Sequence, residues 1–234
     1  MKINDMHLPG KFVFIICIIL FVSGTGVVRA AERAGKVAEV QGTAWAQTGG
    51  EALRKLEKDA LFFVTDRITT ETGSSVKLLF DDNTKFSIGN ESELAIDKFS
   101  YHKTEEANSF SARILKGTFR FVTGLIAKEK PEDMEVKTTV AVIGIRGTQV
   151  LGETTATSAT IILLEPEDTS RKSIIQVANQ FGSVIIDEPG FGTEIPDEFS
   201  PPSPPRRMRL DTINNLTRSL QSIQRINIPR PRMP

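Results

Sequence analysis

The sequence of 234 residues contains one cysteine, two histidines, one tryptophan and one tyrosine. The single cysteine, Cys17, lies in an apolar run near the N-terminus, so the rest of the chain has no thiol. This absence excludes an internal disulfide, catalysis by a thiolate and a metal site built on cysteine. After residue 30 the one histidine is His102, which lies in a polar stretch. We expect it to face solvent, and we predict no catalytic, cofactor-binding or metal-binding residue.

The chain has no excess of either charge, since 29 lysines and arginines balance 29 aspartates and glutamates. A neutral chain has no general attraction to nucleic acid or to an acidic membrane surface, so we expect neither as a partner. The charges are nevertheless unevenly distributed. Residues 153–198 carry nine acidic side chains, and residues 206–234 carry seven arginines against one aspartate. This pattern indicates an acidic face followed by a basic tail, which favours contact between the two or binding of a second partner.

Residues 1–30 have the pattern of a secretory signal peptide. Lys2 and Lys11 precede an apolar run at residues 12–22, and small residues lead to Ala30. The run has 11 residues, far fewer than the roughly 20 that a membrane-spanning helix needs. We expect cleavage near Ala30 and a periplasmic or secreted protein that meets the membrane only through this peptide. The alternative is an uncleaved anchor.

Residues 35–199 consist of short strand patterns separated by turns. In residues 76–80, Val76, Leu78 and Phe80 alternate with Lys77 and Leu79, and in residues 85–88 apolar side chains alternate with polar ones. Asn83 between the two segments tolerates the left-handed backbone of a hairpin turn. Around Gly117 we expect a strand, a glycine turn and a second strand. No helical period interrupts the series, which excludes the crossover helices of a parallel sheet. The sequence therefore predicts an all-β domain built as an antiparallel β-sandwich, a roll or a β-helix-like stack.

A proline-rich stretch at residues 200–207 follows this domain and predicts an extended linker. Residues 208–228 then predict an amphipathic basic helix or tail, and Pro229 stops the helix. One face of this helix is apolar and either packs against its own domain, enters a partner's groove or pairs with a second copy. The apolar side chains on that face are Leu210, Ile213, Leu216, Leu220 and Ile223.

The segment at residues 138–148 places one guanidinium in an otherwise uncharged strand rich in β-branched residues. A charge inside a sheet core is costly unless it is paired, so we expect Arg146 to be buried against a carboxylate or strand-end carbonyls. Gly144 and Gly147 allow a bulge or a close approach of the backbone beside it. The segment therefore predicts a structural lock and not a catalytic centre. The residues of this lock are Thr139, Gly144, Arg146, Gly147 and Thr148.

Five segments, in order along the chain, resemble the FecR family. They share glycines at strand ends, an acidic hairpin turn and an Arg-Gly-Thr turn. The resemblance implies an exported FecR-like β domain over residues 35–199 without naming a ligand. In signalling members of the family a cytoplasmic segment that controls a sigma factor precedes a membrane helix, whereas this chain has a signal-peptide pattern there. The matching pieces lie within residues 35–42, 66–75, 78–84, 115–120 and 139–150.

From these features we expect a non-enzymatic module of the cell envelope that binds a protein partner or serves in signalling. Two alternatives stay open: a module that binds carbohydrate or peptidoglycan of the cell wall, and a periplasmic regulator of a transport or sigma-factor signalling system. Trp45 lies in an early strand and either packs in the fold or stacks on a sugar. The candidate partner contacts are Trp45, Tyr101, Arg206, Arg207, Arg209, Leu216, Leu220 and Ile223.

Overall fold

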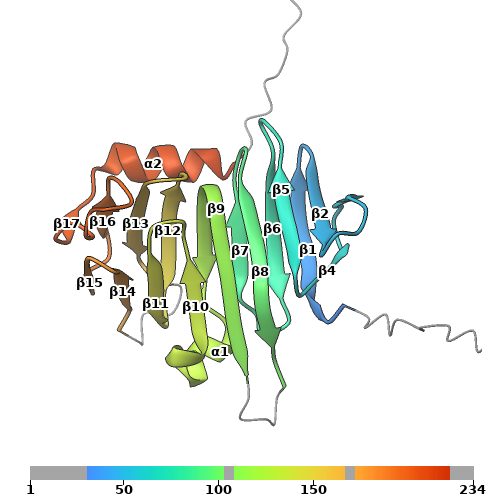
Figure 1. Cartoon of the computed structure of the whole chain (residues 1–234), viewed down its shortest axis with the longest axis horizontal. Coiled ribbons are helices and arrows are strands. Elements are labelled where there is room, and N and C mark those ends of the chain that lie inside the picture. The colour runs from blue at the N-terminus through green and yellow to red at the C-terminus, as the bar shows by residue number, and fades with distance from the viewer. Residues whose placement is uncertain (1–30, 103–107, 167–171, 222–234) are drawn as a thin grey trace, which may run out of the picture. The chain divides into compact units, whose positions relative to one another are not determined.

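The computed structural model describes residues 31–102, 108–166 and 172–221. The chain divides into two compact units, Met1–Ala30 and Ala31–Pro234, and all described residues belong to the second unit. Strands dominate this unit (Figure 1), which confirms the predicted all-β fold. The predicted signal peptide lies outside the described residues.

The strands form two layers, which we call sheet A and sheet B. Neighbouring strands pair antiparallel, except that β10 runs parallel to β9. In order across the layer, sheet A contains β4 (Leu61–Phe63), β1 (Arg33–Gln41), β6 (Ser75–Phe80), β7 (Lys85–Ile88), the second half of β9 (Ser109–Val122), β12 (Gln149–Thr154), β13 (Ala159–Leu164), β16 (Phe191–Ile195) and β17 (Arg206–Arg207). Sheet B contains β3 (Arg54–Lys55), β2 (Ala44–Thr48), β5 (Asp66–Thr70), β8 (Glu93–Ser100), the first half of β9, β10 (Met134–Lys137), β11 (Val142–Arg146), β14 (Ile174–Asn179) and β15 (Gly182–Ile186).

The long strand β9 belongs to both layers. Its first half pairs with β8 and β10 in sheet B, and its second half pairs with β7 and β12 in sheet A. The change occurs at Gly117, which has a φ of +96° and where an added Cβ would lie 2.0 Å from Ser92 Oγ. The predicted turn at this glycine is therefore wrong. The strand bends there and continues, because glycine accepts both this backbone conformation and the close approach of Ser92.

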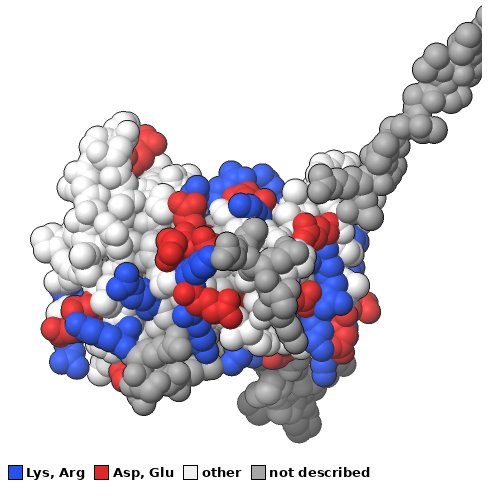
Figure 2. All heavy atoms as spheres, turned by 90° about the horizontal axis from the view of Figure 1, so that it is seen from below, with Lys and Arg blue, Asp and Glu red and all other residues white. Residues whose placement is uncertain are grey.

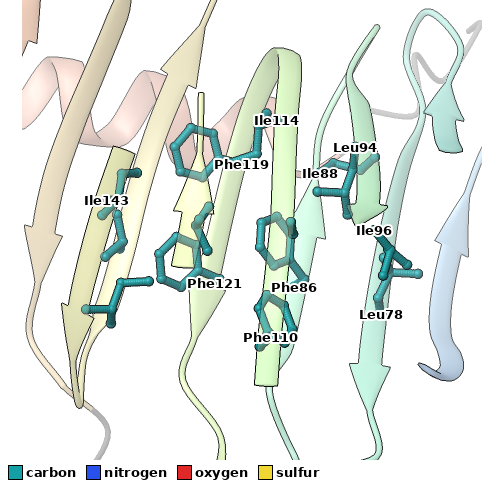
Figure 3. Close-up of a cluster of buried hydrophobic side chains, with 14 of the residues drawn as sticks. Leu78, Phe86, Ile88, Leu94, Ile96, Phe110, Ile114, Phe119, Phe121 and Ile143 are labelled. Carbon is teal, nitrogen blue, oxygen red and sulfur yellow. The ribbon is translucent and has the colours of Figure 1, made fainter. Parts of the chain in front are cut away.

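The hydrophobic core fills the space between the two sheets. Figure 3 shows Phe86, Phe119 and Phe121 of sheet A together with Phe110 and Ile114 of the sheet B half of β9. All of these side chains are buried, and the Phe86 and Phe121 rings stack with their centroids 5.4 Å apart. Two sheets that enclose one such core correspond to the sandwich among the expected architectures.

The predicted hairpin forms as strands β6 and β7. Leu78 pairs with Phe86, and both side chains point into the core, while Lys77 pairs with Ser87 on the outer face. Asn83 in the turn has a φ of +67°. The prediction of a hairpin with one buried face is confirmed, because alternation and turn chemistry indicate the same structure.

Helices are few among the described residues. They are α1 (Leu125–Glu129), a short 3₁₀ turn (Pro131–Asp133) and α2 (Leu210–Ser219). Helix α2 lies within the range expected for the tail helix and crosses strands of sheet A (Figure 1). The residues Arg206–Arg207, expected in the linker, pair with β16 as strand β17. Within the described parts of the chain, no helix is both long and apolar enough to span a membrane.

Candidate functional site

Arg146 is the last residue of β11, and its side chain is exposed on the outer face of sheet B. Along β11 the side chains alternate, so Ile143 and Ile145 are buried in the core while Val142, Gly144 and Arg146 face outward. Within the described residues, Arg146 has no ion pair or side-chain hydrogen bond. The expectation of a buried, paired arginine is therefore wrong, because strand alternation directs this guanidinium to the solvent side.

The Arg-Gly-Thr turn is held by two threonines. Gly147 has a φ of +56° and leads the chain from β11 in sheet B to β12 in sheet A. The Thr148 N–H donates to Thr123 Oγ1 at 2.9 Å, and the Thr123 N–H and hydroxyl donate to the Thr148 carbonyl at 3.1 and 3.2 Å. Thr139, at the other end of the predicted lock, is exposed and donates to the Thr155 carbonyl. A structural connection is present at this turn, but Arg146 takes no part in it.

Gly144 leaves room on the outer face of sheet B. A Cβ at this position would meet only atoms of Gln176, at 3.8 and 3.9 Å. The missing side chain opens a hollow of about 410 Å³, which we call the Arg146 hollow. Its lining combines one guanidinium and one carboxylate with apolar and amide side chains. The lining residues are Pro131, Glu132, Gly144, Ile145, Arg146, Ile174, Gln176 and Ile185.

The Arg146 hollow reaches the edge of sheet B. Strand β15 pairs with β14 on one side and, among the described residues, with no strand on the other. Two large apolar side chains are exposed there, Ile185 at 62% and Phe181 at 43%. Figure 2 shows few charged side chains at its upper left, on the side where β14 and β15 lie in Figure 1. An unpaired strand edge that carries exposed apolar side chains beside a hollow has the features of a docking surface.

Trp45 and Tyr101 lie elsewhere on sheet B. Trp45 is half-buried in β2, and its indole N–H donates to Glu71 Oε1 at 2.8 Å. Tyr101 follows the end of β8 and packs partly against the core. Strands β5, β8, β9 and β10 separate β2 from β11. The structure therefore does not bring Trp45 into the Arg146 hollow.

The predicted contacts in the tail divide into two groups. Arg206, Arg207 and Arg209 are exposed, and Arg206 Nη2 lies 2.7 Å from Glu194 Oε1. Leu216 and Leu220 are instead buried against side chains of sheet A. Of the alternatives for this helix, packing against its own domain accounts for these two leucines. Ile223 lies outside the described residues.

Sequence reasoning missed one buried charged group, the carboxylate of Asp66. Its side chain is fully buried, where it pairs with Arg54 and accepts hydrogen bonds from the Thr48 hydroxyl and the Phe63 N–H. The Arg54 guanidinium also lies over the Phe63 ring, 5.1 Å from its centroid. The sequence signal was the aspartate at the start of an alternating strand in one of the FecR-like pieces. Among the described residues, Arg54 and Asp66 thus form an ion pair whose carboxylate is fully buried and whose guanidinium is partly exposed.

Among the described residues, the titratable groups form no recognisable catalytic arrangement. His102 is exposed, and its ring lies 3.4 Å from Ser100 Oγ. Asp82 is buried in the β6–β7 turn, where burial raises its pKa even though Thr84 donates to it from both its N–H and its hydroxyl. Within residues 31–102, 108–166 and 172–221, no three histidine, cysteine, aspartate or glutamate side chains gather in a possible metal site.

The fold is all-β, and strand β15 has an edge that no described strand pairs. Residues 66–166 match the FecR protein family. This match confirms the predicted resemblance to the FecR family over these residues. No curated protein matches the chain.

Two solved structures of a candidate anti-sigma factor from Parabacteroides distasonis ATCC 8503, at 2.50 and 1.65 Å resolution, are similar to this chain. Sequence identity is 9% in both, and the TM-scores are 0.48 and 0.47. The similarity covers 63% of this chain and 62% of each of those chains, so it spans less than two thirds of either protein.

Proposed function

We propose that this chain is a non-enzymatic module of the cell envelope that binds a protein partner and serves in signalling or regulation. The match of residues 66–166 to the FecR family supports the regulatory class. The observation that carries partner binding is the unpaired edge of β15 beside the Arg146 hollow. An extended segment of the partner adds a strand at this edge and places side chains in the hollow.

The backbone of β15 has the donors and acceptors that such a strand requires. The two-residue turn of the β14–β15 hairpin pairs Asn179 with Gly182, and the ladder continues to Ile175 and Ile186. Because N–H and C=O groups point alternately to the two sides of a strand, Ser183 and Ile185 direct theirs toward the open edge. Main-chain hydrogen bonds at this edge would supply affinity, and the hollow would supply specificity.

The composition of the hollow favours a protein over a polysaccharide. An arginine surrounded by apolar side chains with a polar rim is typical of protein interfaces. The carbohydrate alternative depends on Trp45, which is half-buried, bonded to Glu71 and remote from the hollow along sheet B. We therefore retain a protein as the partner.

Export belongs to the same proposal and depends on the pattern of residues 1–30. If the signal peptide is cleaved as proposed, the protein recovered from the cell envelope begins at Ala31. Its intact mass and N-terminal sequence measure this directly. A protein that retains Met1 and the apolar run would contradict cleavage.

Photo-crosslinking in intact cells tests the partner surface. A photoreactive amino acid replaces Ile185, and a matched control replaces Leu53, since the two are 62% and 60% exposed. We expect a discrete heterologous adduct at position 185, lost when Arg146→Glu is added, and none at position 53. Equal adducts at both positions, or no adduct at position 185, would overturn the proposed surface. An adduct of twice the chain's own mass would show self-association instead of a separate partner.

A further inference from the structure

Two turns at one end of the sandwich each expose a phenylalanine. Phe181 lies in the turn of the β14–β15 hairpin and is 43% exposed, and Phe199 lies in the turn after β16 and is 71% exposed. Figure 1 shows strands β14, β15, β16 and β17 together at this end of the molecule. Exposed aromatic side chains that gather on one surface are typical anchors of a protein interface.

Direct contacts join the two turns. The Asn179 side-chain amide donates to the Ser200 carbonyl at 2.8 Å. An added Cβ at Gly182 would lie 3.2 Å from Cβ of Pro201, so the two backbones approach closely there. Each of these residues is one or two positions from an exposed phenylalanine. The two aromatic side chains therefore belong to one surface, although they come from different sheets.

Side-chain hydrogen bonds fix the backbone of both turns. Asn179 Oδ1 accepts from the Phe181 N–H at 2.9 Å. Asp197 Oδ1 accepts from the Phe199 N–H at 2.9 Å, and Asp197 Oδ2 accepts from the Ser200 hydroxyl at 2.8 Å. The bond from Ser200 and then that from Phe199 lower the pKa of Asp197, so its carboxylate is ionised at neutral pH. Anchors on turns that are already ordered lose little conformational entropy when a partner binds.

The loop that follows β16 lies on the inner side of β15. Val184 packs against the core and Ile185 is exposed, so strand alternation makes Gly182 an inward-facing position. The close approach of Gly182 to Pro201 places this loop on the same inner side. A strand added at the open edge of β15 alternates in the same way. Every second side chain of a partner strand thus points inward, toward the side that carries the turn at residues 197–200.

The chemistry of this turn favours apolar and basic groups. Asp197 and Glu198 directly precede Phe199, and all three side chains are exposed. Among the described residues, neither of these two carboxylates forms an ion pair. Carboxylates beside an aromatic ring attract a cation on an apolar stem, because the stem packs on the ring while the cation pairs with the acid. The same carboxylates are repelled by anionic lipids, so the turn favours a protein over a membrane surface.

We propose that the partner segment that adds to β15 carries apolar and basic side chains at its inward-pointing positions, where they contact Phe199 and Glu198. An apolar side chain packs on the Phe199 ring, and a basic one two positions along the segment pairs with Glu198. Phe181 on the joined turn extends the apolar contact. This inference rests on the proposed function, because it takes strand addition at β15 as its starting point and names the chemistry of the segment.

Fluorescence anisotropy with three labelled peptides tests this inference on the full-length protein. The first peptide has threonine at every second position, with leucine and arginine in turn between them, so that one face is both apolar and basic. The second replaces each arginine by glutamine, and the third reorders the same residues to put leucines and arginines on opposite faces. We expect the first peptide to bind most tightly, and Phe199→Ser to weaken its binding about tenfold.

Matched control variants lie at the opposite edge of the sandwich. Leu53, just before β3, is 60% exposed, and Glu57 is exposed in the loop between β3 and β4. We expect Leu53→Ser and Glu57→Gln to leave peptide binding unchanged. Glu198→Gln should weaken binding about threefold and reduce its dependence on salt. Circular dichroism spectra of the four variants verify that each is folded.

Equal binding of the glutamine peptide or of the reordered peptide would overturn the inference, as would an equal loss in the Phe199→Ser and Leu53→Ser proteins or the absence of peptide binding. Binding to vesicles of phosphatidylcholine and phosphatidylglycerol that Phe199→Ser abolishes would overturn it in favour of a membrane surface. A dimer that the same variant abolishes would overturn it in favour of a second copy of this chain.

Crosslinking at position 185 separates this inference from the proposed function. An adduct at position 185 that Phe199→Ser leaves unchanged would overturn the inference and retain β15 as the partner surface. The absence of that adduct in the parent protein would overturn the proposed surface itself. An adduct that Phe199→Ser and Glu198→Gln both weaken, and that Leu53→Ser leaves unchanged, would support both.

Discussion

Two outward-facing apolar regions of the sandwich differ in what lies over them. On sheet A, Leu151 and Ile162 point away from the core, yet both are completely buried because α2 packs over them. On sheet B, Ile185 also points outward at the end of the layer, and it is 62% exposed. The same strand alternation therefore produces a second small core in one place and an open surface in the other.

The difference shows what the C-terminal tail contributes. The chain continues past the last long strand of sheet A and places Leu216 and Leu220 on its outer face. Ser219 Oγ donates to Thr118 Oγ1 at 2.9 Å, which attaches the end of the helix to strand β9. No described segment does the same for the Arg146 hollow. This apolar face, which the described part of the chain leaves open, is where we propose that a partner binds.

We expect the largest loss of stability from a substitution in the apolar cluster that α2 covers. Leu216→Ala removes a buried side chain from the small cluster under α2, and we expect it to lower the free energy of unfolding by about 2 kcal/mol. Leu210→Ala in the same helix is the matched control, since Leu210 is 76% exposed. Urea unfolding of both variants measures the difference. Equal stability of the two would contradict the view that α2 is held by apolar packing.

We expect a smaller loss of stability from a substitution at Gly89, where the end of α2 packs against the region of β7 and β9. A Cβ at Gly89 would lie 2.4 Å from the Ser219 carbonyl oxygen, a backbone atom that cannot move without displacing the helix end. Gly89→Ala should therefore cost about 1–2 kcal/mol. Gly50→Ala is the control, because an added Cβ there meets no atom within 4 Å. Thermal unfolding compares the two, and a Gly89→Ala protein as stable as the Gly50→Ala protein would show that the helix end is not closely packed.

The sequence predicted the parts of the fold that local patterns determine. Alternation and the Asn83 turn were sufficient for the β6–β7 hairpin, and the Arg-Gly-Thr turn with its neighbouring pieces was sufficient for the FecR resemblance. For the strand of residues 142–146, the same patterns did not predict correctly which face is buried. Both of its faces contain apolar residues, so the pattern alone does not show which face meets the core.

Long-range contacts account for the other differences. Gly117 lies in a bend because Ser92 packs closely against it, and that neighbour is 25 positions away in the sequence. Asp66 pairs with Arg54 across strands, which no local pattern indicates. The unpaired edge of β15 arises from the order of strands in the two sheets. Sequence spacing does not contain that order, so the candidate surfaces became visible only in the structure.

The smallest expected effect concerns the arginine that the sequence placed in the core. Arg146→Ala should change the free energy of unfolding by less than about 0.5 kcal/mol, because the side chain is exposed and unpaired among the described residues. Arg54→Ala is the contrasting variant, since it leaves the buried Asp66 carboxylate without its cation and should cost about 2 kcal/mol or more. Urea unfolding of both at neutral pH measures the difference. A large loss of stability in Arg146→Ala would show that this residue has a structural role, and it would remove the reason to place a partner at the Arg146 hollow. Loss of the position 185 adduct without loss of stability would instead assign Arg146 to binding.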